Sequence, residues 1–187
     1  MTTEETPAEE RTITQTPLLE MAKQKAMKAH KGQKRKTGGD YYNEHILPVA
    51  KAVSYYLENN HNHHKIATHF ADLVLKPYHY HKIILSTPLD ETPIAEQIIA
   101  AAYLHDVLED TTETIDEFPN ITKQLVQLLT KQPEDNYYTF IIRIIDSPLV
   151  EFATIIKLAD IENNMKTLPE GHQKDKYRLS RHILKNK

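Results

Sequence analysis

An apolar run that ends in a dense polar cluster is the feature that most constrains this chain. Residues 94–104 are apolar and rich in small side chains, which predicts a buried helix. His105 and Asp106 follow directly, and Glu109 and Asp110 complete the cluster. Burying a His-Asp pair is costly unless a partner compensates it, and a divalent cation bound by both groups is one solution. The alternative for this segment alone is a solvated acidic helix end with an incidental histidine.

Two further segments offer the additional ligands that one bound cation would need. In the segment 35–50, His45 opens an expected helix whose apolar residues recur at intervals near 3.6. In the segment 153–168, Asp160 lies within an apolar helical run, where an uncompensated carboxylate is costly to bury. Each residue alone is more often an ordinary surface or core group. Taken together they give a candidate set of metal ligands: His45, His105, Asp106 and Asp160.

The donor set and the composition limit the kind of metal site. Two imidazoles and two carboxylates suit Mn²⁺, Fe²⁺ or Zn²⁺ better than Ca²⁺. The chain contains no Cys, which excludes disulfides and thiolate ligands and fits a cytoplasmic protein. No apolar run approaches the roughly 18–20 residues that span a bilayer, so no membrane association is expected.

The chain is expected to form one all-α domain of about eight helices, because helical spacing recurs along it and no hairpin pattern stands out. Residues 1–16 are acidic and polar, lack a signal-peptide pattern and are expected to form a disordered arm. The domain is expected to cover 17–187, starting where Thr16 and Pro17 favour a helix. The expected helices lie at about 17–31, 43–59, 63–75, 93–108, 121–131, 135–146, 148–166 and 173–185.

Charge is unevenly distributed along the sequence. The interval between Lys82 and Lys123 holds nine acidic residues and no Lys or Arg, whereas cations gather at 31–36 and 174–187. This pattern suits a pocket that binds a metal together with a polyanion. A net charge of −3 and a single short basic run argue against a nucleic-acid partner.

Three motifs connect these residues to a known family. AHKGQKRKTGGDYYNEH (29–45) resembles AH-x-x-Q-x-RK-x-G-x-x-Y-x-x-H, AAYLHDVLEDT (101–111) resembles an HD…ED motif, and KLADIENNMKTL (157–168) resembles KLAD-x-x-x-NMRTL. These are motifs of the HD-domain metal-dependent phosphohydrolases. The closest similarity is to the hydrolase domain of RelA/SpoT-type stringent-response enzymes and their small stand-alone relatives. The motifs occur in the family's order, and the resemblance covers about residues 18–185.

The resemblance implies an HD-domain helical fold and an enzyme that removes the 3′-pyrophosphate of guanosine 3′,5′-bis(diphosphate). The products would be GDP or GTP plus pyrophosphate, and Mn²⁺ would be the favoured metal. Glu109 and Asp110 would position the attacking water or accept its proton. The implied substrate contacts are Arg35, Lys36, Asn164 and Thr167.

Some features depart from the family pattern. Ile46 follows His45 where the family usually has Pro, and Lys166 stands where Arg is common. Six histidines crowd into 61–81, which we interpret as a helix and loop of unusual composition, because no carboxylate or Cys accompanies them at ligand spacing. Two alternatives stay open: an HD enzyme for another nucleotide or phosphomonoester, and a non-catalytic nucleotide-sensing module. The oligomeric state is left open.

Overall fold

Helices form the regular structure throughout residues 16–59 and 92–186, the part of the chain that the computed structural model describes. Those of nine or more residues are α1 (Pro17–Ala29), α2 (Leu47–Asn59), α5 (Ile94–Leu104), α7 (Asn120–Leu129), α8 (Tyr137–Ile145), α9 (Val150–Met165) and α10 (His172–Lys185). Two shorter elements are η1 (Tyr42–Ile46) and α6 (Val107–Asp110). The expected helix at 63–75, the histidine-rich stretch 61–81 and residues 1–15 of the expected arm lie outside the described residues.

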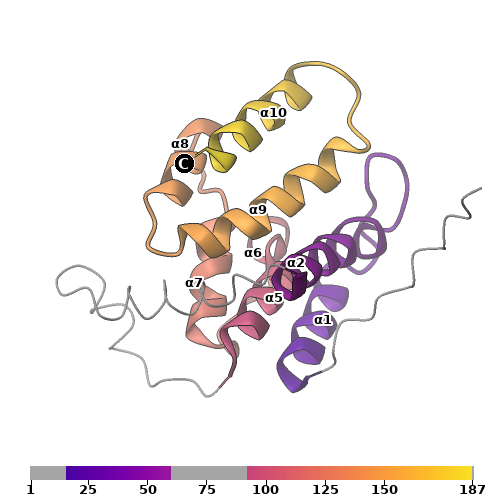
Figure 1. Cartoon of the computed structure of the whole chain (residues 1–187). Helices are drawn as coiled ribbons and strands as arrows, with labels where there is room; N and C mark the ends of the chain where they lie inside the picture. Colours follow the sequence, from indigo (N-terminus) through magenta and orange to yellow (C-terminus); the bar gives the residue numbers. More distant parts are fainter. Residues whose placement is uncertain (1–15, 60–91, 187) are drawn as a thin grey trace, which may run out of the picture.

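Helix α5 occupies the centre of the core. It packs against α1, α2, α7 and α9, and every residue from Gln97 to Leu104 is buried. Ala100, Ala101 and Ala102 lie on it consecutively and have no exposed area, so neighbouring helices can approach it closely on several sides. The buried helix predicted at 94–104 is therefore confirmed. Helix α9 crosses the molecule between α10 and the group α1, α2 and α5 (Figure 1).

Side-chain caps begin two of the helices, α1 and α8. The Thr16 hydroxyl accepts a hydrogen bond from the Leu19 backbone N–H at 3.4 Å, and Pro17 takes the first position of α1, which confirms the predicted start. The Asn136 side-chain oxygen accepts from the backbone N–H groups of Tyr138 and Thr139 at the start of α8, both at 2.9 Å. Each cap satisfies backbone donors that have no partner within the helix.

The helix expected at 93–108 is wrong in its last turn. Helix α5 ends at Leu104, and the short helix α6 starts only at Val107. The His105 imidazole Nδ1 lies 2.8 Å from the Ala102 carbonyl oxygen, so a side chain takes an acceptor at the end of α5. The chain then turns through Asp106, whose φ of −101° and ψ of −4° are not those of an ideal helix. The break separates the His-Asp pair from the acidic pair on α6.

A π-helical turn carries the other candidate histidine. Instead of an α-helix from residue 43, the structure has η1, which contains His45 and runs directly into α2. The segment between Lys36 and His45 is one residue longer than the motif that it resembles. A π turn absorbs one additional residue without breaking the helix, and it keeps His45 buried.

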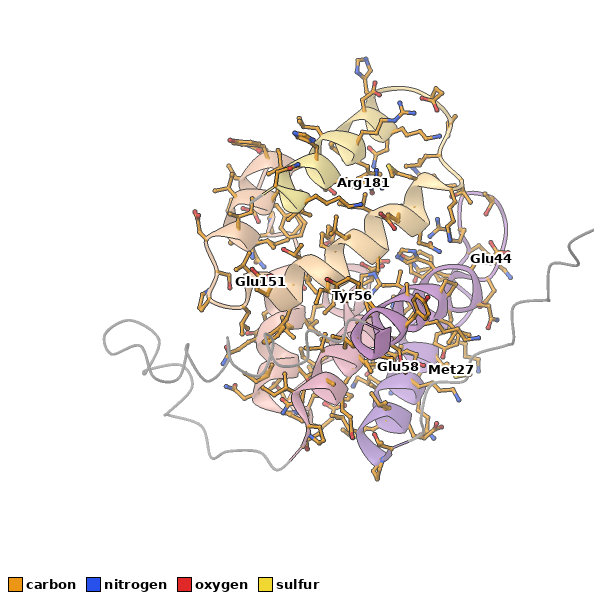
Figure 2. The ribbon with its side chains drawn as sticks, in the orientation of Figure 1. Met27, Glu44, Tyr56, Glu58, Glu151 and Arg181 are labelled. Carbon is orange, nitrogen blue, oxygen red and sulfur yellow. The ribbon has the colours of Figure 1, made fainter. Side chains whose placement is uncertain are left out.

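The outer faces of the helices carry amphipathic and charged side chains (Figure 2). Met27 on α1 and Tyr56 on α2 are both 47% exposed, and Arg181 on α10 contacts Glu162 on α9 at 3.1 Å. Within residues 16–59 and 92–186, no helix combines the length and the apolar character that crossing a membrane requires.

Candidate metal centre

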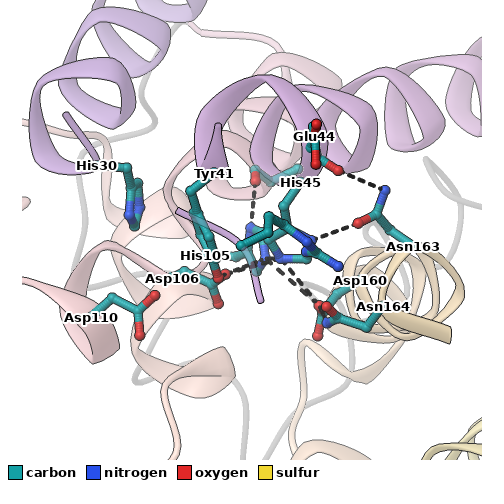
Figure 3. A network of polar contacts seen from close by, with 12 residues as sticks. His30, Tyr41, Glu44, His45, His105, Asp106, Asp110, Asp160, Asn163 and Asn164 are labelled. Carbon is teal, nitrogen blue, oxygen red and sulfur yellow. Dashed lines mark hydrogen bonds and ion pairs between the residues drawn. The ribbon is translucent and has the colours of Figure 1, made fainter. Parts of the chain in front are cut away.

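The four predicted metal ligands meet at one point of the core, although they come from three separate regions of the chain (Figure 3). The two imidazole Nε2 atoms of His45 and His105 face each other at 3.3 Å. Asp160 Oδ1 lies 3.4 Å from the first and 4.0 Å from the second. In the described part of the chain, these three buried residues form a group whose ligand atoms all lie within 4.8 Å of one another. Asp106 is not part of that group, but its Oδ2 lies 3.1 Å from both Nε2 atoms.

The orientation of His45 is set by Asn163. The Asn163 Nδ2 group donates to the Glu44 carbonyl at 3.3 Å, which turns its Oδ1 toward His45 Nδ1, 2.8 Å away. Because an amide oxygen only accepts, His45 Nδ1 must carry the hydrogen. His45 Nε2 then presents a lone pair to the centre.

His105 is oriented in the same way by the backbone. Its Nδ1 lies 2.8 Å from the Ala102 carbonyl oxygen, which only accepts, so Nδ1 again carries the hydrogen. When both rings are neutral, two nitrogen lone pairs therefore point at each other at a distance where only a shared positive charge makes the contact favourable. A proton or a metal ion can supply that charge. An Nδ1–H held by a carbonyl is also the arrangement that metal-binding histidines commonly have.

The electrostatics of the metal-free centre show the same demand for positive charge. Burial lowers the pKa of His105, but the charge and hydrogen bond of Asp106, together with Asp160 and the Ala102 carbonyl, raise it to about 9. Burial raises the pKa of Asp106, yet its contacts with His105 and His45 hold it well below its ordinary value. Two carboxylates beside two buried imidazoles thus favour positive charge at this point, and the donor set fits a divalent metal.

Asp160 is held by two neighbours on α9. Lys157 Nζ contacts its Oδ2 at 2.7 Å, and Asn164 Nδ2 donates to its Oδ1 at 2.5 Å. Burial lowers the pKa of Lys157, but its interactions with Asp160, Tyr137 and Asp106 together outweigh burial, so the net pKa is raised and Lys157 keeps its charge. Asn164 was predicted to contact substrate; in the structure its amide supports a candidate metal ligand.

Tyr41 supports Asp106 from the other side. Its hydroxyl donates to Asp106 Oδ2 at 2.7 Å, and its ring lies 5.1 Å from the rings of both His30 and His45. Burial, reinforced by Asp106 and then Asp110, raises the Tyr41 pKa, so the hydroxyl remains a donor. Sequence reasoning missed this residue. Its position four residues before His45, on the same helical face, was the available signal.

The two predicted catalytic carboxylates lie on α6, and both are exposed. Glu109 Oε2 accepts from the Lys131 backbone N–H at 3.1 Å, and Asp110 Oδ2 accepts from Gln33 Nε2 at 3.0 Å. Figure 3 shows Asp110 on the same side of the cluster as Asp106 and His30. The predicted acidic pair is thus adjacent to the candidate metal ligands, with each carboxylate held by a different loop.

Two of the predicted substrate residues, Arg35 and Lys36, belong to a set of cations that also includes Lys131, Lys157 and Lys176, and we call this set the cationic rim. Arg35 donates to the Thr167 hydroxyl at 3.1 Å, which joins two of the predicted substrate residues across the fold. Lys36 is exposed. Burial first, and then the nearby charges of Lys157, Lys131 and Lys36, lower the pKa of Lys176 on α10. Positive charge from three other segments therefore acts on Lys176, a pattern that suits the binding of an anion nearby.

The chain resembles a known hydrolase in sequence. No protein-family model matches the chain. It is 29% identical over 140 residues to the guanosine-3′,5′-bis(diphosphate) 3′-pyrophosphohydrolase of Aquifex aeolicus (strain VF5). That alignment covers 68% of this chain and 19% of the Aquifex protein, so the chain spans about a fifth of that relative's length.

A solved structure shares the fold. A metazoan orthologue of SpoT, described as hydrolysing ppGpp and acting in starvation responses, superposes with a TM-score of 0.55 at 18% sequence identity. The match covers 92% of this chain and 86% of that one, and it confirms the predicted all-α HD-domain fold. In sequence and in fold, the chain is thus similar to the hydrolase domain of RelA/SpoT-type enzymes, as its three motifs predicted.

Proposed function

We propose that this chain is a metal-dependent nucleotide hydrolase that removes the 3′-pyrophosphate of guanosine 3′,5′-bis(diphosphate), leaving GDP and pyrophosphate. The corresponding guanosine pentaphosphate would leave GTP. The observation that carries the proposal is the pair of buried imidazole Nε2 atoms facing each other at 3.3 Å beside Asp106 and Asp160. Similarity to the Aquifex pyrophosphohydrolase supports the choice of substrate.

His45, His105, Asp106 and Asp160 would hold the metal, for which Mn²⁺ is our first choice, with Fe²⁺ and Zn²⁺ as alternatives. When bound, the cation would supply Lewis-acid polarisation of the phosphoryl group and make water easier to deprotonate.

The acidic pair on α6 would serve the attacking water. Glu109 and Asp110 are exposed carboxylates three and four residues beyond Asp106, so they can accept a proton or orient a water by hydrogen bonds. Attack on the phosphorus of the 3′-pyrophosphate would release pyrophosphate and return the nucleotide 3′-hydroxyl.

The nucleotide would bind across the cationic rim. Arg35 has a planar guanidinium that can stack on the base or pair with phosphate, and its hydrogen bond to Thr167 holds it in place. Lys36 would pair with phosphate as a point charge. Asn164 would act mainly through Asp160, to which its amide is bound.

Turnover of a nucleotide panel tests this proposal. Purified protein with Mn²⁺ should release pyrophosphate from guanosine 3′,5′-bis(diphosphate) and leave GDP, both resolved by anion-exchange chromatography. Deoxynucleoside triphosphates, nucleoside 3′-monophosphates and a chromogenic phosphomonoester complete the panel. Faster hydrolysis of one of these compounds would reassign the substrate. If the metal-loaded protein turned over none of them, the proposal that the chain is an enzyme would be contradicted.

Two variants separate metal binding from other defects. Asp106→Asn and His105→Ala should lose bound metal and activity together, because each removes a group that contacts the centre. Metal content measured by atomic emission on both purified variants checks the assignment. Wild-type metal content in both would contradict the ligand set.

A further inference from the structure

A series of side-chain contacts, none of them with the proposed metal ligands, leads from His30 to Asp110. His30, the residue after α1, lies with its Nδ1 2.7 Å from Gln33 Oε1. Gln33 Nε2 in turn lies 3.0 Å from Asp110 Oδ2. Asp110 lies 77 positions after Gln33 in the sequence, so this contact ties the end of α1 to the end of α6.

The direction of these hydrogen bonds follows from the chemistry of the groups. An ionised carboxylate only accepts, so Gln33 must turn its NH₂ group toward Asp110 and its oxygen toward His30. His30 must then donate through Nδ1. Its Nε2 is buried and has no hydrogen-bond partner among the described residues, which agrees with a tautomer that leaves this nitrogen without a hydrogen.

His30, where this series of contacts begins, is rigidly placed. His30 is 1% exposed, its ring lies 5.1 Å from that of Tyr41, and its backbone N–H donates to the Ala26 carbonyl at 3.0 Å. The Gln33 backbone is fixed on both sides, because its N–H donates to the His30 carbonyl at 3.0 Å and its carbonyl accepts from Tyr41 at 3.1 Å. Gly32, with a φ of +80°, allows the turn between them.

Asp110 itself has the opposite character. It is exposed and lies at the last residue of the four-residue helix α6, where helical packing restrains it little. A donor from a fixed loop is therefore the means by which its carboxylate can keep one orientation. Gln33 occupies Oδ2, and Oδ1 has no hydrogen-bond partner among the described residues, so it is available to a water molecule.

We propose that Gln33, held by His30, is a positioning residue that fixes the orientation of the Asp110 carboxylate for its work on the attacking water. The inference rests on the proposed function, since it concerns the role of Asp110 in turnover. Gln33 itself touches neither the metal ligands nor the reacting atoms; it acts through Asp110.

Kinetics of Gln33→Leu test the proposal. With guanosine 3′,5′-bis(diphosphate) as substrate, kcat should fall about tenfold while KM changes less than about twofold, since orientation and not binding is lost. Metal content and Tm should stay at wild-type values. The matched control is Gln24→Leu on α1, which breaks a 3.0 Å amide–carboxylate contact with Glu20 away from the site and should leave kcat unchanged.

Two further variants separate positioning from packing. Gln33→Glu keeps the size of the side chain but cannot donate from an ionised carboxylate, so it should lower kcat at least as far as Gln33→Leu; a wild-type kcat in this variant would overturn the proposal. In an Asp110→Ala background, Gln33→Leu should cause no further loss of kcat. An equal loss in both backgrounds would show that Gln33 does not act through Asp110.

Crystal structures of wild type and Gln33→Leu make the test independent of turnover. The Asp110 carboxylate should leave its wild-type orientation in the variant, and an unchanged Asp110 side chain would overturn the inference. A wild-type protein that turns over none of the 3′-pyrophosphate nucleotides would instead contradict the proposed function, while these two structures would still decide the role of Gln33.

Discussion

Asn163 shows how a single neutral residue sets up the chemistry of a charged centre. Its amide cannot turn over, because Nδ2 is engaged by the Glu44 carbonyl, and so Oδ1 dictates which nitrogen of His45 carries the hydrogen. The sequence offered no direct sign of this role: Asn163 is one of two adjacent asparagines, and the family motif singles out Asn164. Distinguishing them requires knowing which face of α9 meets η1.

Replacing Asn163 by Leu should therefore weaken metal binding. Without the acceptor, the His45 ring can rotate and Nε2 is no longer held toward the centre, and partners of this kind are worth roughly tenfold to a hundredfold in metal affinity. Titration of the chelator-treated protein with Mn²⁺, followed by isothermal calorimetry, gives the Kd. Asn186→Leu, in an exposed position after α10, is the control and should bind as wild type. Equal affinities in the two variants would remove Asn163 from the support of the centre.

Glu109→Gln should separate chemistry from structure. The Gln oxygen can still accept from the Lys131 N–H, so the loop stays in place, but the amide cannot take a proton from water. Turnover should fall by roughly a hundredfold or more while metal content is retained. Glu134→Gln, an exposed carboxylate of the same loop region, should retain wild-type turnover. A wild-type kcat in Glu109→Gln would mean that Glu109 has no role in turnover and only holds the loop through its contact with Lys131.

At the scale of helices, apolar periodicity predicted the central segments of the helices but not the places where their geometry changes. The regular cores of α5 and α9 lie within their expected ranges, since burial of one face or of the whole helix fixes them. The break at His105 and the π turn at His45 depend on one side chain meeting a particular carbonyl and on one additional residue in a turn. Neither leaves a periodic signal, and both are where the centre is built.

The cap of α8 gives a prediction at this scale. Asn136→Ala would leave the backbone donors of Tyr138 and Thr139 without their side-chain acceptor, which should lower the free energy of unfolding by about 1 kcal/mol. Asn136→Asp keeps an acceptor at the helix start and should be nearly neutral. Urea denaturation followed by circular dichroism measures both. Equal losses in the two variants would mean that the cap itself contributes nothing to the stability of α8.

In the molecule as a whole, the centre joins η1, the end of α5 and α9, three regions far apart in sequence. The sequence predicted the four candidate ligands because expensive polar groups stood out in apolar runs. It did not predict the roles of Tyr41 and Gln33, whose partners Asp106 and Asp110 lie far away in the sequence, or that of Lys157, whose contact with Asp160 spans one turn of α9. A metal bound here would connect the three regions, so its removal should affect the stability of the whole domain.

The stabilisation of the domain by a bound metal should increase with pH. In the metal-free protein the His105 pKa is raised from 6.5 to about 9. A raised pKa contributes stability that is fully present below pH 6.5 and lost as pH rises through 9. A metal ion needs the unprotonated nitrogen, so its binding displaces a proton and gains strength over the same interval.

We therefore expect the Tm of chelator-treated protein to fall between pH 6.5 and 9, and the Tm gain on adding Mn²⁺ to grow across that range. Differential scanning calorimetry with and without the metal, at constant ionic strength, provides both curves. His105→Leu removes the titrating group and one proposed ligand, and should therefore show neither the fall nor the gain. A Tm gain of the same size at pH 6.5 and pH 9 in wild type would mean that metal and proton do not compete for His105.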